Sequence, residues 1–191
     1  MARIRESGMP PLEQWERFFD PEEILEALGC RDLSGDVLEL GCGYGTFTIP
    51  AARRACGTVY ALDIDPLMVA ATAERARRTG VHNVVAEQRD FVCGGSARAA
   101  CSTAYVMLFN ILHLEDPLSL VREAHRVLRP GAILGVLHWK PDATTPGGPP
   151  LEIRPSPEQC RQWGKAAGFR WIRTPELPGS PWHWGMMLER A

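Results

Sequence analysis

The feature that most constrains this chain is an apolar run that ends in three glycines at alternate positions. Residues 37–40 read Val-Leu-Glu-Leu, and Gly41, Gly43 and Gly45 follow them. Glycine adopts positive φ at little steric cost and has no Cβ, so its backbone can approach a bound molecule closely. The pattern predicts a strand that breaks into a loop whose bare backbone lies against a ligand.

Length and composition are those of a folded protein with one substantial core. The chain has 191 residues, of which 45% are hydrophobic and 23% charged, and its net charge of -2 gives no general attraction to polyanions. No apolar run reaches the roughly 18 residues that a membrane span needs, and no hydrophobic signal core follows the first residues. We expect a cytoplasmic protein without nucleic-acid or membrane partners.

The six cysteines include no Cys-x-x-Cys pair and no closely spaced Cys/His set. Such spacing is what zinc sites and secreted disulfide frameworks require. The sequence therefore predicts reduced thiols and no metal site.

Strand-like apolar runs alternate with helix-like segments from residue 37 to about residue 137. This is the pattern of βαβ units around a mostly parallel sheet. The expected strands are residues 36–40, 58–62, 84–88, 103–109 and 132–138, and the expected helices between them are residues 47–55, 66–79 and 117–128. The link at residues 92–101 is predicted to be a loop or a short frayed helix.

The segments outside this core predict a cap and a closing hairpin. Short helices are expected at residues 12–19 and 21–28, and a helix at residues 157–167 precedes strands at 170–174 and 183–189. We predict one domain over residues 1–191. Its parts are a helical cap (1–30), a cofactor-binding core (36–140), a proline-rich crossing (141–157), and a final helix with a terminal hairpin (158–191).

Two common phosphate-binding loops do not fit the glycine pattern. A dinucleotide fingerprint needs its third glycine at position 46, where this chain has Thr46. A Walker-type loop needs a lysine directly after its last glycine, and Gly45 is followed by Thr46 instead. Phosphate is therefore not the expected ligand of the loop.

The sequence resembles the class I S-adenosylmethionine-dependent methyltransferases, whose first motif reads acidic-x-Gly-x-Gly-x-Gly. Residues 39–45, Glu-Leu-Gly-Cys-Gly-Tyr-Gly, match it position by position. Asp63 ends the next strand, where such enzymes grip the ribose, and Asp90 with Phe91 follows the third strand, where they contact adenine. The resemblance implies a three-layer α/β fold with a Rossmann-like sheet of about seven strands. Most of these strands are parallel, the C-terminal one is antiparallel, and helices cover both faces.

The resemblance also implies a cofactor, S-adenosylmethionine, with S-adenosylhomocysteine as its product. The cofactor-binding residues that it implies are Glu39, Gly41, Cys42, Gly43, Tyr44, Gly45, Asp63, Ile64, Met68, Asp90, Phe91 and Asn110. One departure is that many relatives carry Phe-Asp before the fourth strand, whereas this chain has Cys101 and Ser102. The departure weakens a subfamily assignment more than the fold.

Methyl transfer from a sulfonium is an in-line displacement, so the enzyme mainly aligns the nucleophile and excludes water. A hydroxyl or ammonium acceptor also needs a base. His113 is the predicted catalytic residue. His138 is an alternative, since both histidines lie at the carboxyl ends of expected strands. A packing role remains open for each.

The acceptor is predicted to be a small molecule, because the chain shows no basic signature and no large inserted domain. We expect a monomer or a homodimer. Trp15, Phe18 and Phe19 either close over the site, together with residues 141–157, or pack in the core. Two alternatives stay open: a non-catalytic S-adenosylmethionine-binding sensor or regulatory subunit, and a nicotinamide-dependent oxidoreductase.

Overall fold

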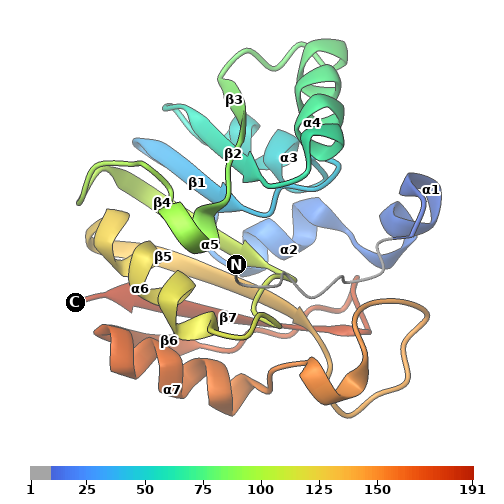
Figure 1. Ribbon diagram of the computed structural model, residues 1–191, viewed down its shortest axis with the longest axis vertical. Helices are drawn as coiled ribbons and strands as arrows, with labels where there is room; N and C mark the ends of the chain where they lie inside the picture. Colours follow the sequence, from blue (N-terminus) through green and yellow to red (C-terminus); the bar gives the residue numbers. More distant parts are fainter. Residues whose placement is uncertain (1–9) are drawn as a thin grey trace.

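A seven-stranded sheet lies between two sets of helices in the computed structural model, which describes residues 10–191 (Figure 1). The strands are β1 (Asp36–Leu40), β2 (Val59–Asp63), β3 (Val84–Gln88), β4 (Thr103–Phe109), β5 (Leu128–Trp139), β6 (Phe169–Arg173) and β7 (His183–Arg190). The α-helices are α1 (Leu12–Trp15), α2 (Pro21–Ala27), α3 (Thr48–Arg54), α4 (Pro66–Arg78), α5 (Phe91–Gly94), α6 (Pro117–Val127) and α7 (Pro157–Ala167). Short 3-10 helices are η1 (Glu16–Phe18) and η2 (Leu151–Ile153).

The strand order is β3-β2-β1-β4-β5-β7-β6, and β7 runs in the direction opposite to the other six strands. From β1 the chain builds outward through β2 and β3, then returns to place β4 and β5 on the other side of β1. Open sheets of this kind bind ligands at the carboxyl ends of the strands where the order reverses. The topology therefore places the expected site between the ends of β1 and β4.

Four of the helices begin in the same way, with a capping side chain followed by proline. The cap oxygen accepts a hydrogen bond from a backbone amide of the first turn, and proline fills a position whose own amide would have no partner. The pairs are Asp20-Pro21, Asp65-Pro66, Asp116-Pro117 and Ser156-Pro157. These local signals explain why the starts of the helices are readable from the sequence.

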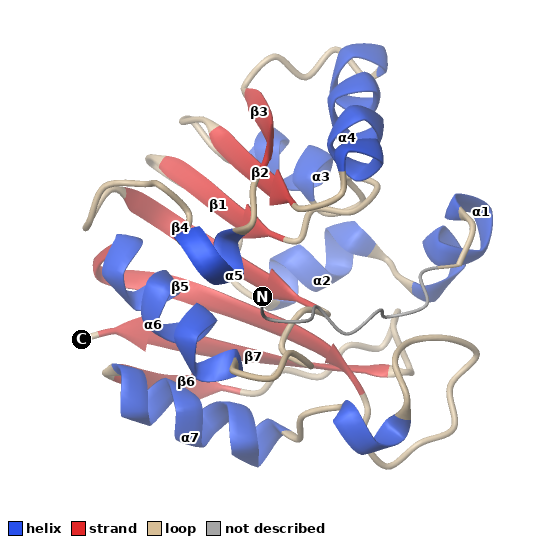
Figure 2. Cartoon of the chain, viewed as in Figure 1, coloured by secondary structure: helices blue, strands red, loops and turns tan. Residues whose placement is uncertain are grey.

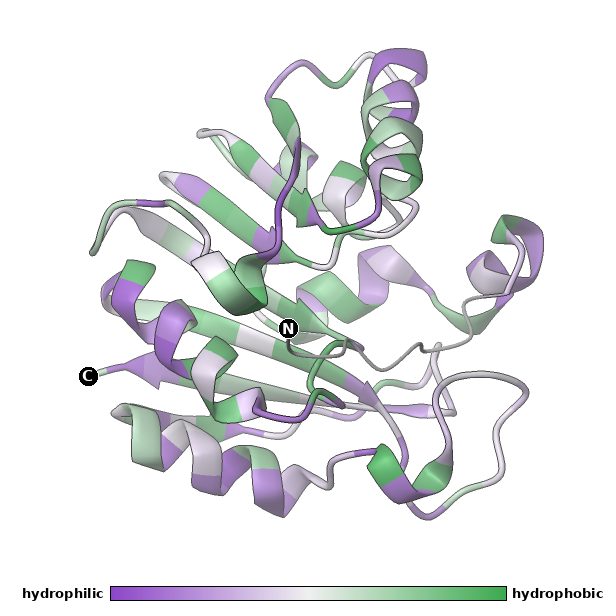
Figure 3. Ribbon diagram, viewed as in Figure 1, coloured by the Kyte–Doolittle hydropathy of each residue, from purple (hydrophilic) through white to green (hydrophobic). Residues whose placement is uncertain are grey.

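Both faces of the sheet are buried under helices, each with its own hydrophobic core. Alternate residues of β4 pack into one core or the other. Tyr105 and Met107 pack with α2 and α3, whereas Val106 and Leu108 pack with α6. Figure 2 shows α5, α6 and α7 over one face and α2 and α3 behind the other. Apolar residues concentrate in the central strands, while α4 and α7 carry many hydrophilic residues (Figure 3). In the part of the chain described, no helix is long and apolar enough to cross a membrane.

The observed elements confirm the predicted fold class, with differences at some boundaries. Three strands have the predicted bounds, and residues 91–94 form the short helix α5. β5 begins at Leu128 rather than at residue 132, because Leu128 pairs with Thr103 before an irregularity leads to the Tyr105–Ile133 pair. Residues 1–9 of the predicted cap lie outside the described residues.

Gly135 of β5 is expected to be intolerant of a side chain. A Cβ at this position would overlap the Tyr105 hydroxyl oxygen. That hydroxyl is buried and donates a hydrogen bond of 2.9 Å to the Leu28 carbonyl. Gly135→Ala should therefore lower the free energy of unfolding by about 1–3 kcal/mol, measured by urea denaturation.

Gly94→Ala is the matched control, since an added Cβ there meets nothing within 4 Å. Equal stabilities of the two variants would contradict the packing role of Gly135.

Candidate active site

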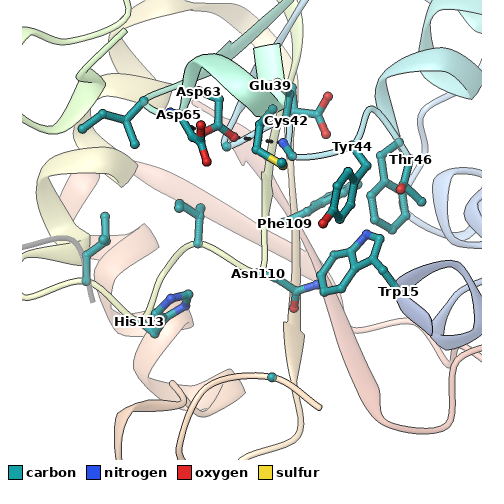
Figure 4. A pocket seen from close by; sticks show the side chains of 18 of the residues that line it. Trp15, Glu39, Cys42, Tyr44, Thr46, Asp63, Asp65, Phe109, Asn110 and His113 are labelled. Atoms are coloured by element: carbon teal, nitrogen blue, oxygen red, sulfur yellow. Dashed lines mark hydrogen bonds between the residues drawn. The ribbon is translucent and has the colours of Figure 1, made fainter. Parts of the chain in front are cut away.

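A cavity of about 460 Å³ opens at the carboxyl ends of β1, β2 and β4. Figure 4 shows Asp63 and Asp65 on one side of it, with Asn110 and His113 on the opposite side. Eleven of the residues predicted for the site line this cavity: Glu39, Gly41, Cys42, Gly43, Tyr44, Asp63, Ile64, Met68, Phe91, Asn110 and His113. The site residues that lie far apart in the sequence are therefore neighbours in the fold.

The three glycines of the loop all have positive φ, but they serve different purposes. Gly41 (φ 84°) and Gly43 (φ 52°) line the cavity. Gly45 (φ 73°) does not, and a Cβ there would lie 3.1 Å from the hydroxyl oxygen and 3.3 Å from the Cα of Thr72 in α4. Gly45 is thus needed for the close approach of α4 to the loop.

Asp63, at the end of β2, holds the glycine loop. Its carboxylate accepts hydrogen bonds from the amides of Gly43 (2.9 Å) and Asp65 (3.0 Å). The Thr72 hydroxyl fixes the other side of the loop by donating to the Gly43 carbonyl at 2.9 Å. Burial raises the pKa of Asp63, while the two amide bonds oppose that rise.

Glu39 places a buried carboxyl group in the wall of the cavity. Its side chain is 2% exposed and accepts a hydrogen bond from the Thr48 hydroxyl. Burial raises the pKa of Glu39 to about 8, and the nearby charge of Asp63 adds to the rise. A cation in the cavity would favour the ionised form of this group.

Polar atoms without partners mark the wall of the cavity around Asn110. Asn110 has φ 55°, which is uncommon outside glycine, and both atoms of its side-chain amide are buried without a hydrogen-bond partner among the described residues. The Thr46 hydroxyl, which also lines the cavity, is likewise buried without a hydrogen-bond partner among the described residues. Buried polar atoms are costly unless they are satisfied, so these groups are suited to a polar ligand.

Asp90 lies away from the cavity wall. It is exposed and caps α5 by accepting a hydrogen bond of 3.1 Å from the Cys93 amide. Its neighbour Phe91 is 5% exposed and lines the cavity. Among the described residues no group of three or more His, Cys, Asp or Glu side chains is placed to hold a metal ion.

His113 also lines the cavity and is 3% exposed. Its Nδ1 lies 3.4 Å from Nε2 of His138, which is fully buried behind it. The two histidines that the sequence offered as alternatives are therefore in contact.

The aromatic residues of the cap divide between the cavity and the core. Trp15 lines the cavity, whereas Phe18 and Phe19 are buried against Trp139. Trp15, Phe47, Trp139 and Gly148 form a part of the wall that the sequence motifs did not predict. The aromatic pattern of residues 15–19 and the proline-rich crossing at residues 141–157 were the signals that pointed to it.

Comparisons with known proteins agree with this geometry. A family model described as a methyltransferase domain matches residues 37–131. The solved structure of a SAM-dependent methyltransferase from Aquifex aeolicus superimposes with a TM-score of 0.81 at 25% identity, covering 94% of each chain.

Two curated relatives are named as methyltransferases of a ribosomal protein and of a ribosomal RNA. The ribosomal protein L11 methyltransferase of Methylococcus capsulatus is 34% identical over 152 residues, which cover 76% of this chain and 49% of that protein. The 23S rRNA (uracil(1939)-C(5))-methyltransferase RlmD of Alcanivorax borkumensis is 47% identical over 60 residues, covering 30% and 13%. The chain thus spans about half the length of the first relative and less of the second.

The chain therefore belongs to the class I S-adenosylmethionine-dependent methyltransferases. It is a methyltransferase enzyme, and S-adenosylmethionine is its cofactor. This assignment replaces the oxidoreductase and the non-catalytic sensor as interpretations of the glycine loop.

The small-molecule acceptor predicted from the sequence is wrong. The curated relatives are named for a ribosomal protein and a ribosomal RNA, which are macromolecules, so the expected absence of a nucleic-acid partner loses its support as well. The physical reason is that net charge describes the average field of a chain. A macromolecular acceptor can be recognised by a local surface that leaves this average unchanged.

Proposed function

We propose that this enzyme transfers a methyl group from S-adenosylmethionine to a ribosomal protein. The observation that carries the proposal is the match to the ribosomal protein L11 methyltransferase, which spans 76% of this chain. Ribosomal RNA is the second candidate, supported by the shorter match of 60 residues to the 23S rRNA methyltransferase. The longer match favours the protein acceptor.

The cavity suits the cofactor in three respects. The Gly41 and Gly43 backbone leaves room for a ligand to lie against it, and Asp63 ends the neighbouring strand with a carboxylate suited to a ribose diol. The unpartnered amide of Asn110 offers both a donor and an acceptor to a polar group. We propose that these residues hold S-adenosylmethionine together with Glu39, Cys42, Tyr44, Ile64, Met68 and Phe91.

S-adenosylmethionine supplies a methyl group activated by positively charged sulfur. The residues of the chain align the acceptor with this group and exclude water, for which the apolar wall of Phe47, Phe109 and Trp139 is suited. We assign to His113 the removal of a proton from the acceptor, because it lines the same cavity. The Trp15 side of the cavity, formed by the cap and the proline-rich crossing, is proposed to face the acceptor.

Transfer of radiolabelled methyl groups tests the acceptor. The purified enzyme is incubated with labelled S-adenosylmethionine and, in separate reactions, with ribosomal protein L11, protein-free 23S rRNA and intact ribosomes. Label on L11 is expected. Label on RNA alone would replace the protein acceptor with RNA, and no label in any reaction would overturn the proposal when calorimetry shows that the cofactor binds.

Asp63→Ala is expected to weaken cofactor binding by at least about 10-fold, or about 1.4 kcal/mol. The substitution removes the carboxylate that orients the Gly43 amide and the charge proposed to bind the ribose. Isothermal titration calorimetry with S-adenosylhomocysteine measures the change. Glu74→Ala, at an exposed position of α4 outside the cavity wall, is the control, and equal affinities of the two variants would contradict the role of Asp63.

A further inference from the structure

Two buried histidines, one following β4 and one within β5, meet at the wall of the cavity. His113 follows β4 and His138 belongs to β5, and they are 3% and 0% exposed. Their Nδ1 and Nε2 atoms are 3.4 Å apart and the rings are inclined at 73°. Two imidazole nitrogens at this separation interact favourably when one carries the hydrogen and the other carries the lone pair.

The backbone decides which nitrogen of His138 carries the hydrogen. The Nδ1 atom of His138 lies 3.4 Å from the Trp139 carbonyl oxygen, which can only accept a hydrogen bond. Nδ1 is therefore the donor. Burial lowers the pKa of His138 well below its usual value, so the ring is neutral and its Nε2 has a lone pair.

The other groups that act on His138 reinforce its neutral form. Within residues 10–191 these groups are His113, His183 and Arg154, each of which is cationic when charged and lowers the pKa of His138. His183 is itself neutral because burial lowers its pKa to about 3. The ring of Trp184 stacks beside His138 at 6.5 Å and contributes no charge.

These contacts set the proton arrangement of His113. Since Nε2 of His138 accepts, Nδ1 of His113 donates to it, which leaves Nε2 of His113 as the nitrogen that carries the lone pair whenever that ring is neutral. Figure 4 shows the ring of His113 at the cavity, with Asn110 on the same side. Through the two rings, the Trp139 carbonyl thus favours a hydrogen on Nδ1 of His113.

We propose that His138 is a positioning residue that holds His113 as its Nδ1–H tautomer, so that Nε2 accepts the proton of the methyl acceptor. The role in transfer rests on the proposed function. As the acceptor nitrogen or oxygen bonds to the methyl carbon, the carbon–sulfur bond breaks with its electron pair on sulfur. The acceptor proton moves to Nε2 of His113 and later to water, which restores the neutral ring.

Nitrogen NMR of the protein labelled with ¹⁵N-histidine tests the proton arrangement without any acceptor. His113→Gln and His138→Gln assign the two rings by loss of their signals. At a pH where both rings are neutral, both are expected as Nδ1–H tautomers. An Nε2–H tautomer for His113 would overturn the inference, whether or not methyl transfer is observed.

Substitution of His138 tests its role in transfer to ribosomal protein L11. His138→Phe keeps a ring but removes the accepting nitrogen, and we expect kcat to fall about 10-fold with an unchanged KM for the cofactor. His138→Gln places a carboxamide oxygen where it can accept from His113, and we expect it to recover most of the rate. Combined with His113→Gln, His138→Phe should cause no further loss.

The outcomes separate the two proposals. Equal losses in His138→Phe and His138→Gln, with the His113 tautomer unchanged, would make the contact merely structural and overturn the positioning role. If the phenylalanine variant does not fold, the rate and the NMR spectrum of the glutamine variant decide whether His138 has the positioning role. The expected tautomers without transfer to any ribosomal acceptor would remove the catalytic role together with the proposed function, while the proton arrangement would stand.

Discussion

Replacing Glu39 with glutamine is expected to remove most of the pH dependence of cofactor binding between about pH 6 and pH 8. Glu39 is 2% exposed, and burial raises the pKa of its carboxyl group to about 8. The carboxyl group is therefore largely protonated at neutral pH in the free enzyme. A cationic ligand such as S-adenosylmethionine favours the ionised form and should expel the proton.

The sign of the effect follows from linkage. Binding that favours the ionised form becomes tighter as pH rises toward the pKa of the free enzyme, about 8, and levels off above it. The stability of the free enzyme depends on pH in the opposite direction, because it falls as pH rises. The folded state holds a proton that the unfolded state releases above about pH 4.5, so the contribution of Glu39 to stability falls between about pH 4.5 and pH 8.

Calorimetry in buffers of different ionisation enthalpy measures the expelled proton directly. The native enzyme should release up to about one proton per cofactor at about pH 7, and Glu39→Gln should release almost none. The glutamine variant should also be the more stable of the two at about pH 8 in urea denaturation, on the order of 2 kcal/mol or more. Glu74→Gln, on the exposed face of α4, is the control and should leave both quantities unchanged. Equal proton release from the native and Glu39→Gln enzymes would contradict this account.

Gly41→Ala is expected to weaken cofactor binding by about 10- to 100-fold, equivalent to about 1.4–2.8 kcal/mol. Gly41 lines the cavity at φ 84°, and a Cβ there would lie 3.2 Å from the side chain of Ile111, another residue of the wall. The methyl group would distort the loop and occupy space against which the cofactor is proposed to lie. Calorimetric titration with S-adenosylhomocysteine measures the loss.

Gly45→Ala is a matched control for Gly41→Ala. Its φ of 73° imposes a similar backbone strain of about 1–2 kcal/mol, but Gly45 faces Thr72 of α4 rather than the cavity. Both variants should lose stability in thermal unfolding, and only Gly41→Ala should lose most of its affinity. If the two lost affinity equally, loop strain rather than contact with the ligand would explain the effect.

The sequence predicted the core strands well because their signals are local. Val84–Gln88 begins with an apolar triplet and Thr103–Phe109 is mostly apolar, and the observed strands have the predicted bounds. The start of β5 was missed because it depends on pairing of Leu128 with Thr103, a contact between residues far apart in the chain. Propensity and periodicity do not contain such pairing.

The candidate site was predictable where the motif acts through the backbone. The glycines and Asp63 lie together because the ends of adjacent parallel strands meet at one edge of the sheet. The contact between His113 and His138 was not predictable, because it requires β5 to lie beside β4 and the two rings to point toward each other. The assignment of Asp90 to adenine binding stays a prediction, since its carboxylate caps α5 in this structure.

The fixed conformation of the glycine loop has a consequence for the rate of cofactor binding. The loop is already fastened on both sides, by Asp63 to the Gly43 amide and by Thr72 to the Gly43 carbonyl. The conformational entropy of these residues is therefore lost when the protein folds and not when the cofactor arrives. Cofactor association then requires no folding of this loop, and its rate should follow the viscosity of the medium as a diffusional encounter does.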